Sequence, residues 1–369
     1  MLLLRSNLRL LLAQLDGLAE TPYFSSELDA YIRELRDALA KLLSKVEESP
    51  PTINLDVAQF ISNEVWRLTQ FLTGSTAKQI PYEVVFAIKR AAQEWGTDDL
   101  LITTAIVQEA NFYFHGSSRD FFDLVERELG VKINARPVQI ALPYVYRHKP
   151  LFCVPLFHEF GHFVDADNEI VTTSLLNSPA HVGPDLPDVK PSAEIGGLSG
   201  EERKFWESVV RNHRMEYFAD LVSVAYVGKA AQGFLQEFIP NNRAEPSHPS
   251  SASRFQLMTD FINGKSNPIL DLFQDALVCR GLPRLTHRFS NLDVEETFGN
   301  VRPCQLASDQ EVFGIFDAGW SFLQQMATKP SGAWSALSEA EIERIANDLT
   351  EKSIRNMMIR EGWNAALNP

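Results

Sequence analysis

Residues 158–162 read HEFGH, so two histidines lie four positions apart and bracket a glutamate. If this segment is helical, His158 and His162 lie one turn apart on the same face, where two imidazole nitrogens can be directed at one metal ion. Glu159 lies beside them, and its carboxylate can take a proton from water instead of binding the ion. The pattern predicts a metal-dependent hydrolytic site. The alternative is a helix that carries two hydrogen-bonded histidines.

A third ligand decides between these interpretations, and residues 213–228, HRMEYFADLVSVAYVG, contain a candidate. Glu216 and Asp220 are also four positions apart, so they face the same way on a second helix. Glu216 would complete a zinc site of two histidines and one glutamate, with the fourth position left open. Asp220 would accept a hydrogen bond from the ring N–H of a ligating histidine and fix its orientation. We therefore expect Zn²⁺ to be bound by His158, His162 and Glu216.

Other residues near these motifs remain open as participants. Asp165 is a rival ligand, but it lies on the same helix as both histidines and cannot easily close a tetrahedron with them. His213 lies three positions before Glu216, where it is an alternative ligand or a donor to the transition state, and a role outside the metal shell is favoured. Two tyrosines on the second helix are possible oxyanion donors, although simple packing is favoured for both: Tyr217 and Tyr226.

Taken together, the motifs resemble those of the gluzincin peptidases, in particular the CAAX prenyl protease and heat-shock membrane peptidase family. HExxH is followed by ExxAD at 216–220 and then by HPxxxxR at 248–254, and the resemblance covers residues 81–262. It implies a zincin-like core in which Glu159 is the base and either His248 or Arg254 stabilises the oxyanion. Most of that family is membrane-bound, so this chain resembles its small soluble members, the minigluzincins. Prenylated substrates are not implied.

The pattern of apolar residues along the chain predicts the elements that position these residues. It indicates a predominantly helical α+β protein in three segments. Residues 1–75 read as an N-terminal helical module, 76–262 as the peptidase core, and 263–369 as a helical C-terminal region. An apolar stripe at helical spacing predicts either a bundle within the chain or a coiled-coil arm for homo- or hetero-oligomers. That stripe consists of Leu28, Ile32, Leu35, Leu39, Leu42 and Val46.

Two strand-like runs precede the HEFGH segment, at 99–107 and 137–146, with a helix expected over 118–129 between them. The second run could pair with an extended peptide substrate along a sheet edge. That role requires one side of its backbone to be unpaired. Residues 177–200 are rich in proline and glycine and are interpreted as a lid over the site or as a loop insertion.

The composition and net charge of the chain limit the classes of partner that it can bind. Net charge is −14 with a pI of about 5.1, which disfavours sequence-independent binding to nucleic acid or anionic lipid. No run of residues is long and apolar enough to span a bilayer, and residues 1–20 lack the pattern of a cleaved signal. The three cysteines form no CxxC pair and indicate buried thiols in a reducing compartment. These features predict a soluble cytoplasmic protein.

The function expected from the sequence is that of a soluble zinc metallopeptidase, in which Glu159 assists the attack of zinc-activated water on a peptide or protein substrate. A competing hypothesis is an inactive peptidase-like scaffold that acts as a sensor or adaptor through its N-terminal helices. Hydrolysis of a small amide is a third possibility. Retention of Glu159, which zinc binding does not need, favours an enzyme.

Overall fold

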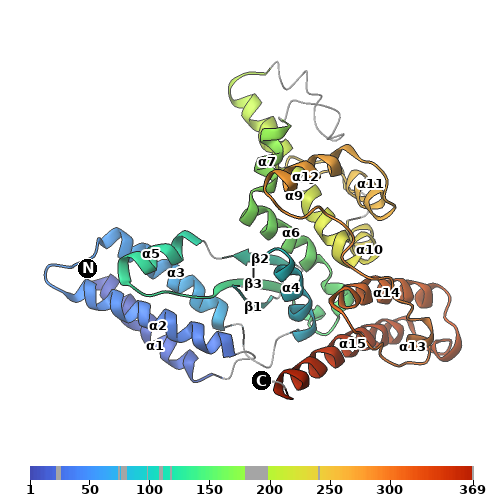
Figure 1. Cartoon of the computed structure of the whole chain (residues 1–369), viewed down its shortest axis with the longest axis horizontal. Coiled ribbons are helices and arrows are strands. Elements are labelled where there is room, and N and C mark those ends of the chain that lie inside the picture. The colour runs from blue at the N-terminus through green and yellow to red at the C-terminus, as the bar shows by residue number, and fades with distance from the viewer. Residues whose placement is uncertain are drawn as a thin grey trace. The chain divides into compact units, whose positions relative to one another are not determined.

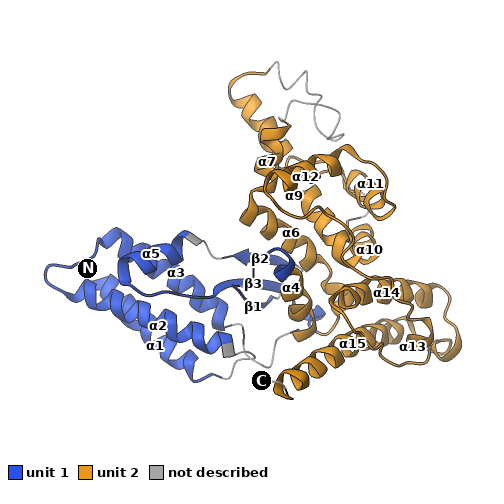
Figure 2. Cartoon of the chain, in the orientation of Figure 1, with its two compact units in different colours: residues 1–81, 92–147 blue, residues 82–91, 148–369 orange. Residues whose placement is uncertain are grey.

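The computed structural model describes residues 1–21, 26–73, 75, 81–97, 99–107, 111–116, 119–178, 198–239 and 242–367. The chain divides into two compact units, and Figure 2 shows both (unit 1, 1–81 and 92–147; unit 2, 82–91 and 148–369). Helices predominate and one small sheet is present, which confirms the predicted fold class (Figure 1). The division differs from the three predicted segments, because it groups the sheet with the N-terminal helices. The proposed lid lies almost entirely outside the described residues.

Unit 1 contains a helical bundle whose apolar stripes are buried against one another. Its helices are α1 (Leu2–Ala19), α2 (Ser26–Glu47), α3 (Leu55–Thr73) and α5 (Arg119–Leu129). Every residue of the predicted α2 stripe is completely buried. Burial of one large aliphatic side chain contributes about 1.5–3 kcal/mol, so this stripe is a main source of the bundle's stability. The bundle alternative therefore accounts for the heptad-like spacing.

The sheet of unit 1 has the order β1–β3–β2, formed by β1 (Leu100–Val107), β2 (Tyr113–Gly116) and β3 (Arg136–Pro143). β1 runs parallel to β3, and β2 runs antiparallel to it. Both strands predicted from the sequence are present, although the second ends at Pro143 and is followed by the 3-10 helix η1 (Tyr144–Tyr146). β2 is too short to give a periodic signal. Because β3 is hydrogen-bonded on both sides, the prediction that it adds a peptide substrate along its edge is wrong.

Unit 2 holds the helices that carry the motifs. Its elements include η2 (Pro150–Cys153), α6 (Pro155–Asn168), α7 (Ile170–Asn177), α9 (Gly200–Val227), α10 (Lys229–Phe238), α11 (Ser251–Ile262), α12 (Pro268–Cys279), α13 (Glu295–Gly299), α14 (Asp309–Thr328), η3 (Gly332–Trp334) and α15 (Glu339–Leu367). The helix α4 (Tyr82–Glu94) contributes its first ten residues to this unit. α9 contacts α6, α7, α10, α11 and α14, so it is the central helix of the unit.

An aromatic cluster fixes the rotation of α6 about its axis. Phe157 packs against Tyr226 of α9 and Phe316 of α14, with ring centroids 6.0 and 5.6 Å apart. Phe160 adds a second contact with Tyr226 at 6.2 Å. Successive residues of a helix are about 100° apart, so burial of Phe160 turns His158 and His162 toward the opposite side. The apolar residues of the HEFGH helix thereby decide where its polar residues point.

Some of the helices begin or end at residues that favour a helix terminus. α9 begins directly after Ser199, whose side chain makes no capping hydrogen bond, and runs unbroken to Val227. It ends at Gly228, whose φ of +54° lies in the left-handed region that glycine adopts without strain. At the start of α15, the Glu341 carboxylate accepts a hydrogen bond from the Ser338 backbone N–H at 2.9 Å, as a capping box requires.

The described helices and the cysteines bear on two predictions made from composition. None of the described helices is both long and apolar enough to cross a lipid bilayer. Cys153 is buried as expected, but Cys279 is exposed and Cys304 is partly exposed, so the prediction of three buried thiols is wrong for two of them.

Candidate metal centre

The two motif helices meet through their small residues. A Cβ atom on Gly161 of HEFGH would lie 2.6 Å from the Cα of Ala219 and 3.1 Å from the Cβ of Val222. Ala219 is the alanine of the ExxAD motif. The glycine of one motif therefore lets the backbone of α6 approach the alanine of the other. The space beside Gly161 is filled by α9 and is open neither to a strand nor to a substrate.

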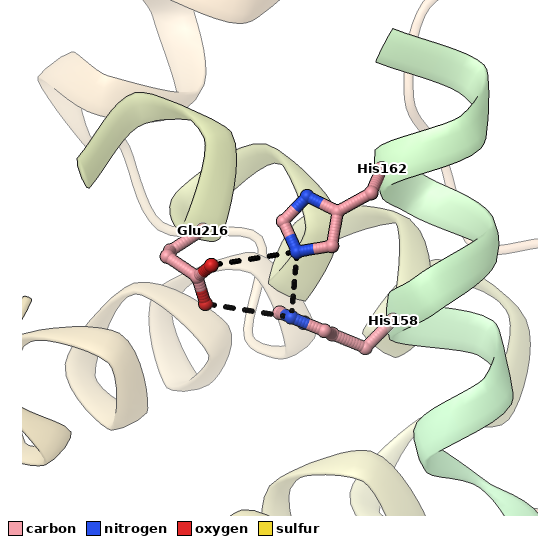
Figure 3. Close-up of side chains that lie close together, drawn as sticks. All are labelled: His158, His162 and Glu216. Atoms are coloured by element: carbon pink, nitrogen blue, oxygen red, sulfur yellow. Dashed lines mark hydrogen bonds and ion pairs between the residues drawn. The ribbon is translucent and has the colours of Figure 1, made fainter. Parts of the chain in front are cut away.

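This approach brings together the three predicted ligands, His158, His162 and Glu216, whose ligand atoms all lie within 4.8 Å of one another (Figure 3). The two Nε2 atoms of the histidines are 3.1 Å apart. Each faces a different oxygen of Glu216, at 3.4 Å from Oε2 for His158 and 3.4 Å from Oε1 for His162. This group could hold a metal ion.

The spacing of these atoms is close enough for one ion to bind all three side chains. Ligands bound about 2.0–2.1 Å from a zinc ion at tetrahedral angles are separated by about 3.3 Å. The two histidine nitrogens are 3.1 Å apart, and each lies 3.4 Å from a different oxygen of the Glu216 carboxylate. Two facing imidazole nitrogens and a carboxylate are also a donor set that zinc commonly accepts. The donor set and its close spacing therefore fit a metal ion such as zinc.

Asp220 orients the first histidine and is itself held by an arginine. His158 donates from Nδ1 to Asp220 Oδ1 at 3.0 Å, which leaves Nε2 facing the other ligands. Arg254 donates to both oxygens of Asp220 at 2.7 Å and lies 3.3 Å from Glu216 Oε2. Asp220 and Arg254 are 1% and 5% exposed, so this pairing takes place away from water. Asp220 therefore makes the contact that its expected role, orienting a ligating histidine, requires.

Charge pairing sets the protonation of this cluster. Burial disfavours the charged form of His158, but hydrogen bonds to Asp220 and Glu216 outweigh it and raise the pKa of His158 to about 9. Burial also acts against ionised Glu216 and Asp220. The contacts with His158 and Arg254 outweigh it, so the pKa of each carboxyl lies below its ordinary value. Both carboxylates are thus ionised and ready to accept hydrogen bonds or a cation.

Glu159 has a different environment from the other two carboxyls. It is partly buried, and burial raises the pKa of Glu159 above its ordinary value even though His158 and His162 lower it. It does not belong to the three-residue metal group. A carboxylate with a raised pKa next to such a group has a greater affinity for a proton, which is the property that a general base needs.

Of the two residues expected to stabilise an oxyanion, only His248 is open to solvent. Its side chain is 54% exposed, and its Nε2 lies 3.6 Å from Glu216 Oε1. Arg254 is buried and occupied by Asp220 and Glu216. The structure brings both residues to the cluster, but the contacts of Arg254 are with the carboxylates that hold the centre.

The remaining candidates have other contacts. Asp165 is buried and accepts a hydrogen bond from the backbone N–H of Val171 at 2.6 Å, at the start of α7. His213 donates from Nε2 to the carbonyl oxygen of Glu245 at 2.7 Å. The two tyrosines that were possible oxyanion donors are at most 1% exposed: Tyr217 and Tyr226. Neither Asp165 nor His213 belongs to the metal group found among the described residues.

Two features of this centre were not predicted from the sequence. The contact between Gly161 and Ala219 was not foreseen, although a small residue in each motif is a signal that two helices approach closely there. The hydrogen bond of His213 to Glu245 was also missed, because its acceptor is a backbone carbonyl. Every residue has one, so the residue type gives no signal of this contact.

Comparison with known proteins adds no relative. The chain matches no family model, no curated protein and no solved structure. The resemblance to gluzincins therefore stays a prediction from the three sequence motifs.

Proposed function

We propose that this chain is a zinc-dependent metallopeptidase of the gluzincin type. The observation that carries the proposal is the meeting of His158, His162 and Glu216, whose ligand atoms lie within 4.8 Å of one another. The two motifs that supply them are 54 residues apart between the last histidine and the glutamate, so helix packing alone brings them together (162 to 216). Glu159, outside the metal group, is the feature that a purely structural zinc site does not need.

In this proposal the zinc ion is held by His158, His162 and Glu216. When bound, it supplies a Lewis acid that lowers the pKa of a water molecule and polarises the carbonyl of the scissile bond. Asp220 keeps the Nδ1 proton of His158 in place, so that Nε2 is the nitrogen that would release its proton and bind the ion. Arg254 keeps Asp220 ionised and fixed.

Glu159 is proposed as the general base and acid. Its carboxylate takes a proton from the attacking water and later gives it to the leaving amine. Burial raises its pKa, which suits a group that must first accept and then release a proton near neutral pH.

His248 is proposed as the donor to the oxyanion. It is exposed beside Glu216, whereas Arg254 is buried and paired. A single donor of this kind contributes about 10²–10³ in kcat. The predicted substrate is a peptide or protein, and a cytoplasmic location stays a prediction from the sequence.

The competing hypothesis is a catalytically inactive scaffold that keeps zinc for structure. Replacement of Glu159 by glutamine separates the two, because the amide keeps the shape of the side chain but cannot accept a proton. We expect Glu159→Gln to lower peptidase activity by about 10²–10⁴-fold and to leave zinc content unchanged. Glu237→Gln, on the exposed end of α10, is the matched control and should have wild-type activity. Equal activity of Glu159→Gln and wild type would contradict the proposed mechanism.

A further inference from the structure

The segment that carries His248 has almost no packing of its own. Residues 242–248 are all exposed, and Pro249 is the first buried residue after them. A segment with so few buried contacts relies on hydrogen bonds for a fixed position. Its last residue, His248, nevertheless lies close to the metal centre, with its Nε2 3.6 Å from Glu216 Oε1.

The ends of this segment are fixed at the start of α11. Ser251 donates its backbone N–H to the carbonyl of Asn242 at 3.1 Å, and its hydroxyl accepts from the N–H of Asn242 at 3.2 Å. Within the segment, Glu245 and His248 exchange two backbone hydrogen bonds of 2.8 and 3.2 Å. Residues 245–248 thus form a tight turn with His248 as its last residue. These bonds give the turn its shape but do not attach its tip to the metal centre.

The attachment comes from α9, one turn before Glu216. The buried ring of His213 donates from Nε2 to the carbonyl of Glu245 at 2.7 Å. Asn212 donates from Nδ2 to the carbonyl of Pro246 at 3.1 Å. Since a carbonyl can only accept, Nε2 of His213 carries a proton. Both donors therefore hold successive carbonyls of the same turn.

The face of α9 shared by these residues links the turn to the metal ligand. His213, Glu216 and Asp220 follow the i, i+3, i+7 spacing and lie on one side of the helix. The helix that supplies the glutamate ligand thus also fixes the exposed turn that presents His248. We propose that His213 and Asn212 are positioning residues that hold the 245–248 turn so that His248 stays beside the metal centre. The catalytic part of this inference rests on the proposed function.

Amide hydrogen exchange of the full-length, zinc-loaded protein tests the attachment without any assay of activity. We expect His213→Leu to speed exchange of the backbone amides of Glu245 and His248 by about tenfold, since one buried hydrogen bond is lost. His213→Gln, whose amide nitrogen can reach the same carbonyl, should restore most of the protection. His287→Leu, the same change at an exposed histidine, should leave exchange in the turn unaltered. Unchanged exchange in folded His213→Leu would overturn the proposal.

Asn212→Ala provides a second variant of low folding risk, because Asn212 is only partly buried. It removes the bond to Pro246 and should also speed exchange in the turn. Because His213 keeps its own bond in this variant, the increase should be smaller than in His213→Leu. No increase in Asn212→Ala, or an increase spread over the whole of unit 2, would contradict a local attachment.

Kinetics then test whether His213 acts through His248. With zinc content unchanged, His213→Leu should lower kcat by about tenfold and leave KM within about twofold of wild type. In a His248→Ala background the same change should have no further effect, since the residue it positions is gone. An equal loss of kcat in both backgrounds would show that His213 acts by another route. An inactive wild-type protein would contradict the proposed function alone, and the exchange experiment would still decide the attachment.

Discussion

At the scale of single residues, the candidate centre pairs every buried charge. Glu216 meets His158, His162 and Arg254, and Asp220 meets His158 and Arg254. Removal of one partner from such a buried pair leaves the other charged and unpaired, which costs more than the pair contributed. The side chains that do not bind the metal are therefore expected to matter for metal affinity as well as for stability.

Asp220→Asn tests this expectation. The asparagine keeps the size of the side chain but loses the charge that faces Arg254, and it weakens the acceptor for His158. We expect zinc affinity to fall by about 10–100-fold, as for other partners of metal-bound histidines. Competition with a chelator of known affinity measures the loss. Asp275→Asn, on the exposed face of α12, serves as the control. Unchanged affinity in Asp220→Asn would mean that His158 does not need this acceptor.

Most of this centre was predictable from residue types and spacing. Four-residue spacing on two helices identified His158, His162, Glu216 and Asp220, because it depends only on helix geometry. The partners of Arg254 could not be identified, since a motif gives no distances between helices. His213 remained ambiguous for the same reason: spacing placed it near Glu216, but only the fold shows that its ring turns to a backbone carbonyl.

At the scale of secondary-structure elements, the decisive contact is the one between α6 and α9. The helices and two of the strands were predictable, because their apolar periodicity is local. Their pairing was not, and β2 was missed because four residues give no pattern. β3 is the central strand only because β2 pairs with its second edge. Since β2 was not predicted, that edge of β3 was wrongly expected to be free.

Gly161→Ala tests the α6–α9 contact. A methyl group there would lie 2.6 Å from the Cα of Ala219, so the helices must separate or tilt. We expect a loss of about 1–3 kcal/mol in the free energy of unfolding, together with weaker zinc binding. Chemical denaturation and metal titration measure the two effects. Gly362→Ala in α15 has open space around it and should be neutral or stabilising by up to about 1 kcal/mol. Equal behaviour of the two variants would contradict a tight helix contact at Gly161.

At the scale of the whole molecule, the metal-binding group lies entirely in unit 2. The metal group found among the described residues comes from α6 and α9, whereas the helical bundle of unit 1 has a hydrophobic core of its own. A ligand that binds only the folded form stabilises the part that contains its site. Zinc is therefore expected to act on unit 2 more than on unit 1.

Differential scanning calorimetry, with and without a chelator, tests this division. We expect two unfolding transitions, and we expect zinc to raise the midpoint temperature of only one of them. At a zinc concentration about 100 times Kd, the stabilisation is about 2.7 kcal/mol. In Glu216→Ala, zinc should no longer shift that transition. A single transition that zinc shifts as a whole would contradict the independence of the two units.

The most direct test of the central claim is the metal content of the protein purified without added metal. Wild type, Glu216→Ala and Glu207→Ala would be compared by mass spectrometry, where Glu207 is a half-exposed residue of the same helix α9. The geometry predicts about one zinc per chain in wild type and in Glu207→Ala, and loss of the metal in Glu216→Ala. Zinc retained at the wild-type level by Glu216→Ala, or no zinc bound by wild type even after zinc is supplied, would contradict the proposed metal centre.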